Sequence, residues 1–143
     1  CDATWASDQL SASVPQKLSN LTGLRYMADN AKCHAARQGQ LLLLRHCANS
    51  APSHWLRLMS PASTAHAALL HDNMIDAALT DILGCPCASP DQLRRALSQA
   101  RLPLSDFGGL GLTSASAIRH AAYVGRFAST WASTRARGRE CSA

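Results

Sequence analysis

Residues 63–84 read STAHAALLHDNMIDAALTDILG and form the longest periodic stretch of the sequence. Their apolar side chains recur at helical spacing and share one face, which comprises Ala68, Leu69, Ile75, Ala78, Leu79, Ile82 and Leu83. Gly84 is suited to the left-handed conformation that ends many helices. Asp72, Asp76 and Asp81 lie along the same segment, and we interpret them as its solvated face. The stretch predicts one long amphipathic helix.

The composition extends this prediction to the whole chain. The 143 residues include 26 Ala and 20 Leu, but only two Val and three Ile. Ala and Leu favour helices, whereas β-branched residues favour strands. Further helical patterns begin after breaks near Pro15, Asp29 or Asn30, Ser53, Pro90, and Thr113 or Ser114. We predict an all-α fold, with about six helices in an irregular bundle.

The same patterns suggest how the chain is divided. We assign residues 1–14 to a frayed N-terminal stretch, 15–136 to a helical domain, and 137–143 to a basic disordered tail. The last helix is expected to end near Arg135. On it, Ala117, Ala121, Gly125 and Ser129 repeat every four residues and form a ridge on which another helix can pack closely. This ridge and Leu41–Leu44 call for more partner surface than one small domain offers, so we expect a fragment of a larger protein.

The basic residues are concentrated near the C-terminus. The formal net charge is +5, and the segment from Arg119 to Arg139 contains five Arg and no acidic residue. A basic helix can contact a nucleic-acid backbone. Alternatively, the arginines form a solvated tail that balances the negative end of the helix dipole. The candidate nucleic-acid-binding residues are Arg119, Arg126, Arg135, Arg137 and Arg139.

The six cysteines do not form a metal-binding pattern. Cys85 and Cys87 are separated by one residue, and Cys33 and Cys47 each adjoin a histidine. Zinc sites instead use pairs of ligands about two to four residues apart, arranged as two half-sites. We therefore expect reduced thiols, an intracellular location in the cytoplasm or nucleus, and no metal or cofactor. No apolar run is long enough for a membrane span, so no membrane is expected as a partner.

No catalytic site can be assembled from the sequence. The glycine-rich segment Gly108–Leu112 lacks the spacing of a dinucleotide fingerprint and the Lys of a P-loop. The helix that follows it has free N–H groups that are suited to an anion. The simpler interpretation is a tight turn whose glycines allow positive φ and close backbone approach. The histidines are scattered, and we expect surface or partly buried side chains rather than ligands.

Several segments, taken in order, resemble a known family. The sequence contains LLLLRHC at 41–47, WLRLMSP at 55–61, LP at 102–103, GGLGLTSA at 108–115 and AAY at 121–123. This order is similar to the helical region downstream of the polymerase palm in reverse-transcriptase-like polyproteins of non-LTR (LINE-type) retroelements. The similarity covers Gln38 to Trp131, about two-thirds of the chain. It marks Gly108, Gly109, Gly111 and Tyr123 as structural residues of the family motif.

The resemblance implies a polymerase parent but no activity in this chain. Reverse transcriptases hold two metal ions on an aromatic-Ala-Asp-Asp turn, and no Asp-Asp pair occurs here. Whether the chain is part of an enzyme is left open; the parent would be an RNA-directed DNA polymerase. We therefore expect a non-catalytic post-palm segment that touches RNA or DNA backbone and packs on the remainder of a larger polypeptide. The alternative is a stand-alone helical protein-interaction or structural module.

Overall fold

The computed structural model describes residues 8–9, 11–13, 34–84, 89–104 and 108–140. Within these ranges every regular element is helical and no strand occurs, which confirms the all-α prediction. The helix expected from Pro15 lies outside the described residues. Of the stretch predicted to fray, the structure describes only residues 8–9 and 11–13, which are helical.

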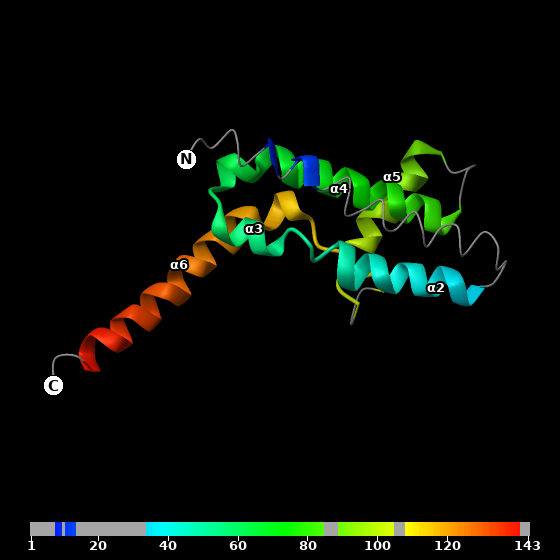
Figure 1. The fold of residues 1–143 in the computed structure, drawn as a ribbon. Coiled ribbons are helices and arrows are strands. Elements are labelled where there is room, and N and C mark those ends of the chain that lie inside the picture. The colour runs from blue at the N-terminus through cyan, green and yellow to red at the C-terminus, as the bar shows by residue number, and fades with distance from the viewer. Residues whose placement is uncertain (1–7, 10, 14–33, 85–88, 105–107, 141–143) are drawn as a thin grey trace.

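In the described residues from His34 onward, five α-helices and one π-helical turn follow one another (Figure 1). They are α2 (His34–Leu43), η1 (Leu44–Ala48), α3 (Ser53–Leu58), α4 (Pro61–Leu83), α5 (Pro90–Ala100) and α6 (Ala115–Glu140). α6 continues past the expected end near Arg135, so residues 137–140, which the sequence assigns to a tail, are helical. Arginine favours helices, and cations stabilise a helix C-terminus, which explains the extension.

Local capping signals set the bounds of α4 and α5. Ser60 accepts a hydrogen bond from the backbone N–H of Ser63 at the start of α4, and Gly84 ends that helix with a φ of 61°. At the start of α5, the side chain of Ser89 accepts from Gln92 N–H while the side chain of Gln92 accepts from Ser89 N–H. This reciprocal arrangement is a capping box, and it lies at the break near Pro90 where the sequence predicts that a helix begins.

Two small clusters of buried apolar side chains hold the helices together. The first joins η1, α4, the end of α5 and the segment before α6, through Leu44, Ile75, Leu79, Ala100 and Leu112. The second joins α3, α4 and the start of α6, through Leu56, Ala68 and Ala115, with Ile118 and Ala122 packed against it. Within Leu41–Leu44, Leu44 is fully buried while Leu42 is 56% exposed.

The buried face of α4 matches its apolar pattern only in part. Ala78 and Ile82 pack against the core. Ala68, Ile75 and Leu79 are buried as expected, but Leu69 and Leu83 are exposed. The buried positions are Thr64, Ala67, Ala68, His71, Asp72, Ile75 and Leu79. These follow the helical spacing of three and four residues, so the buried stripe of α4 includes three polar side chains.

Candidate nucleic-acid interface

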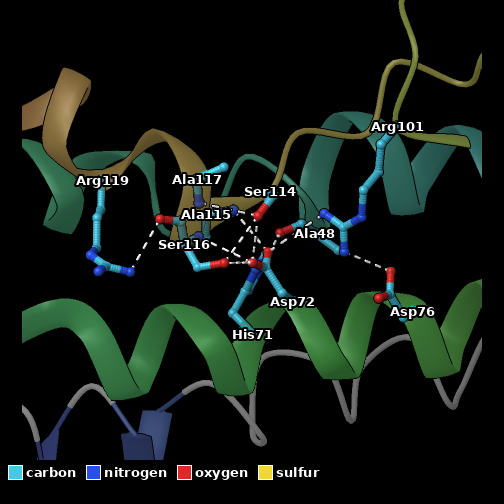
Figure 2. Close-up of polar contacts among 10 residues, drawn as sticks. All are labelled: Ala48, His71, Asp72, Asp76, Arg101, Ser114, Ala115, Ser116, Ala117 and Arg119. Carbon is cyan, nitrogen blue, oxygen red and sulfur yellow. Dashed lines mark hydrogen bonds and ion pairs between the residues drawn. The ribbon is translucent and has the colours of Figure 1, made fainter. Parts of the chain in front are cut away.

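Asp72 anchors the start of α6, the helix that carries the candidate arginines. Its carboxylate accepts hydrogen bonds from the backbone N–H groups of Ala115 (2.8 Å) and Ser116 (3.0 Å), and from the hydroxyl of Ser114 (2.7 Å) (Figure 2). The hydroxyl of Ser116 donates to the same carboxylate. Ser114 Oγ accepts the next N–H, that of Ala117 (3.2 Å), so that Ser114, one of the two residues at which the sequence predicts the helix to begin, is its N-cap.

The solvated role predicted for Asp72 is therefore wrong, because this side chain is only 6% exposed. Burial raises the pKa of Asp72, but the hydrogen bonds from Ser116, Ser114 and Ala115 outweigh burial and hold the pKa below its ordinary value. The carboxylate also faces the positive end of the α6 dipole. Hence the anion at this helix N-terminus is a side chain of the protein itself.

Arg101 balances the acidic side chains of α4. Its Nη2 lies 2.7 Å from Oδ1 of Asp76, and its Nη1 lies 3.9 Å from Oδ1 of Asp72. Arg101 directly follows α5, so this pair of contacts joins the end of α5 to α4 beside the start of α6 (Figure 2). Asp76 is partly buried rather than solvated, which corrects the prediction for a second acidic residue.

His71 is buried next to this site and is 2% exposed. Its Nε2 lies 3.0 Å from the carbonyl oxygen of Ala48, at the end of η1. Because a carbonyl can only accept, Nε2 carries the proton and donates, while Nδ1 is buried without a partner in the described part of the chain. Burial lowers the pKa of His71 below its ordinary value, which keeps the ring neutral.

The glycine segment packs its backbone against the end of α5. The N–H groups of Leu110 (3.1 Å) and Leu112 (3.2 Å) both donate to the carbonyl of Ala100, and Gly111 donates to that of Leu102 (2.9 Å). Gly109 is buried so close to this backbone that a Cβ there would overlap the carbonyl of Leu102.

Gly108 and Gly111 have φ values of 64° and 66°. The tight turn predicted for this segment is confirmed, and its N–H groups face protein carbonyls. The turn positions the residues that open α6. The amide of Asn49 supports the same connection: in the orientation that satisfies both groups, it exchanges two hydrogen bonds with the backbone of Thr113.

The candidate residues on α6 fall into three groups. Arg126 and Arg135 are exposed. Arg119 is half-buried and points toward α4, and its Nη1 donates to the carbonyl of Ser116 (3.2 Å) (Figure 2). The side chains of Arg137 and Arg139 lie outside the described part of the chain. The structure therefore brings Arg119 to the anchored start of α6 and places Arg126 and Arg135 on its exposed half.

The exposed half of α6 also carries large apolar side chains. The C-terminal part of α6 runs outward, away from the body formed by α3 and α4 (Figure 1), and every side chain described from Val124 onward is exposed. Val124 is 63% exposed, Phe127 57% and Trp131 72%. Tyr123, the last residue of the AAY segment, is half-buried and contacts Phe127 edge to face, with ring centroids 4.8 Å apart.

Other kinds of site find no support among the described residues. These residues contain no group of three or more His, Cys, Asp or Glu side chains placed to hold a metal ion. None of the described helices combines the length and the apolar character needed to cross a membrane. Cys47 is exposed and carries a free thiol.

Asp72 and His71 are residues that sequence reasoning did not place in the core, although both are buried. The available signal was the spacing of positions 64, 67, 68, 71, 72, 75 and 79, which forms a helical stripe once polar residues are allowed on the buried face.

Comparison of the sequence with models of protein families, with curated proteins and with solved structures finds no match.

Proposed function

We propose that this chain is a non-catalytic helical segment of a reverse-transcriptase-like retroelement protein, from the region after the polymerase palm, and that it supports nucleic-acid binding through α6. One observation carries the binding proposal. The half of α6 that leaves the body presents Arg126 and Arg135 to solvent, and no acidic residue lies between Arg119 and Arg139.

The packing of the quoted motifs supports their interpretation as one unit. Leu44, from the LLLLRHC segment, shares a buried cluster with Leu112 of the glycine segment. Leu56, from the WLRLMSP segment, shares the second cluster with Ala115 and with Ala122 of the AAY segment. Segments far apart in the sequence thus meet in the core, which gives a physical reason for them to occur together.

The chemistry of α6 suits a phosphate backbone. All five basic residues from Arg119 to Arg139 are arginine rather than lysine. A guanidinium offers a planar fork of donors that matches the oxygens of a phosphate. Binding of this type is sequence-tolerant, and its free energy comes largely from released counterions. We therefore expect weak binding that falls steeply with salt.

The test measures the affinity of the full chain for a fluorescent duplex across a range of salt concentrations. With about three to five phosphates contacted, log K should fall against log salt with a slope of roughly −3 to −4.5. Replacing Arg135, Arg137 and Arg139 together by Gln should flatten this slope by up to about 2.7, because each neutralised phosphate contributes about 0.9.

A matched control removes the same charge elsewhere. Arg57, on α3, and Arg94 and Arg95, on α5, are exposed, and their joint replacement by Gln lowers the net charge equally. This control should leave most of the slope in place. If both triple variants have the slope of the parent chain, or lose it equally, the proposal that α6 binds the backbone is wrong.

A helical interaction module is the second candidate, and exposed leucines favour it. Leu42, Leu69 and Leu104 are each at least half exposed, as expected if another protein or the remainder of a longer polypeptide packs on them. The coding region upstream separates the two candidates. An aromatic-Ala-Asp-Asp turn in the same frame would support the polymerase segment, and a complete upstream region without one would support the module.

A further inference from the structure

Three aromatic residues form a stripe on the exposed half of α6. Tyr123, Phe127 and Trp131 follow one another at intervals of four residues. Each such step advances about 6 Å along a helix and turns only about 40° around it, so the three side chains lie on one side. Arg135 comes four residues later and extends the stripe. We call Tyr123, Phe127, Trp131 and Arg135 the aromatic ladder.

Nothing in the described part of the chain covers the side chains of Phe127 and Trp131. The helices that contact α6 are α3 and α4, and the contacting apolar residues Ala115, Ile118 and Ala122 lie in its first turns. Phe127 and Trp131 are 57% and 72% exposed. Grouped apolar surface of this kind marks a binding site rather than an ordinary solvated face.

The charge around the ladder selects an anionic occupant. Arg126 is exposed on its flank, Arg135 is exposed at its end, and no acidic residue lies between Arg119 and Arg139. A second copy of α6 would bring arginines against arginines. Lipid is disfavoured because Val124 is the only aliphatic side chain larger than alanine in that stretch, whereas helices that lie in a bilayer surface need several.

We propose that the aromatic ladder binds single-stranded nucleic acid, with bases stacked on Phe127 and Trp131 and phosphates held by Arg126 and Arg135. This inference rests on the proposed function and narrows it from nucleic acid in general to single strands. In a duplex the faces of the bases are covered by their neighbours, so exposed rings gain little there. In a single strand each base has a free face on which an aromatic ring can stack.

The spacing of the ladder fits this mode of binding. Tyr123 and Phe127 already contact each other, so the open step lies between Phe127 and Trp131. That step advances about 6 Å. A base inserted between two rings separates them by two stacking layers of about 3.4 Å each, or about 7 Å. Small rotations of two exposed side chains supply the difference. Arg135 offers a further planar surface for stacking.

The test compares the full chain and its variants on a fluorescent single strand of about 16 nucleotides and on the duplex of the same sequence. Both RNA and DNA strands are used. Trp131→Ala should weaken single-strand binding about five- to tenfold, because each stacked base contributes measurably to affinity, and should change duplex binding less than twofold. Trp131→Phe should keep most of the single-strand affinity, since it retains an aromatic face.

Val124→Ala is the matched control. Val124 is about as exposed as Phe127 and Trp131 and lies on the same helix, but it has no aromatic face. It should leave both affinities within about twofold of the parent chain. The inference is overturned if Val124→Ala weakens single-strand binding as much as Trp131→Ala, because the aromatic face would then have no special role. It is also overturned if Trp131→Ala acts equally on both probes, or acts only on binding to anionic vesicles.

Failure of this inference differs from failure of the proposed function. If replacing the arginines reduces the salt dependence of binding to both probes while Trp131→Ala changes neither affinity, backbone binding stands and the aromatic ladder has no role. If neither probe binds in a salt-dependent way, the proposed function fails and the inference fails with it. Circular dichroism of each variant checks that helix content is unchanged, as expected for substitutions at exposed positions.

Discussion

The contact between Asp72 and the start of α6 allows a quantitative prediction. Replacing Asp72 by Ala leaves the N–H groups of Ala115 and Ser116 without their acceptor; the first of these bonds is buried and the second is partly buried. Each unsatisfied buried donor costs about 1–3 kcal/mol, whereas the hydroxyl of Ser116 can turn to that of Ser114, 3.1 Å away. We expect Asp72→Ala to lower the free energy of unfolding by about 3 kcal/mol.

Urea unfolding followed by circular dichroism measures this loss, and for a chain of this size it corresponds to a fall in Tm of about 6–12 °C. Asp72→Asn keeps one acceptor oxygen and should cost about half as much. Asp76→Ala is the control, since it removes a partly exposed ion pair with Arg101 and should cost less than about 1 kcal/mol. If Asp72→Ala costs no more than Asp76→Ala, Asp72 does not anchor α6.

Three further predictions concern pH, packing and the thiol. The pKa of His71 in the folded chain is lowered from 6.5, so the unfolded chain takes up a proton at this histidine at a higher pH than the folded chain does. The free energy of unfolding should therefore fall as the pH drops below about 6.5, and His71→Gln should reduce this dependence on pH. The pKa of Asp72 is lowered from 3.8, so its carboxylate stabilises the folded state above about pH 3.8 and this contribution is lost as the pH falls below that value. Acid unfolding of Asp72→Asn, compared with that of the parent chain, measures the contribution. Gly109→Ala should destabilise the fold by about 2–3 kcal/mol by overlap with neighbouring backbone, whereas Gly39→Ala, in open space on a helix, should stabilise it by about 0.5–1 kcal/mol in the same urea assay. Cys47 should react with a thiol reagent in the native chain, and a lack of reaction before unfolding would contradict its exposure.

The sequence predicts the helices well because their signals are local. Ser89 and Gln92 are three residues apart, and Gly84 directly follows the helix that it ends. The glycine turn is predictable for the same reason, since glycines at 108, 109 and 111 indicate positive φ and close approach. Each of these features depends on residues within one or two turns of chain.

The anchor of α6 was not predictable by the same reasoning. Asp72 and its partners Ser114 and Ser116 are 42 and 44 residues apart, and neither end of the contact has a local pattern that indicates the other. An aspartate on an amphipathic helix is most simply placed in solvent, because burial of an unpaired charge is costly. Here four donors at a helix N-terminus remove that cost, so tertiary structure reverses the expectation.

The N-terminus of α6 is held by the rest of the protein, whereas its C-terminal part is exposed, and the two ends carry opposite charges. A carboxylate at the N-terminus and the arginines close to the C-terminus each complement the helix dipole, so the arrangement that stabilises α6 also places basic residues at its exposed end. Ser116 and Arg126 are ten residues apart, or about 15 Å along the helix, which exceeds the screening length of about 8 Å at physiological salt. A change at Asp72 therefore acts on how α6 is held, whereas a change at Arg126 or Trp131 acts on what α6 can bind. Because these effects are separable, a variant that loses binding at full stability identifies the exposed half of α6 as the binding surface.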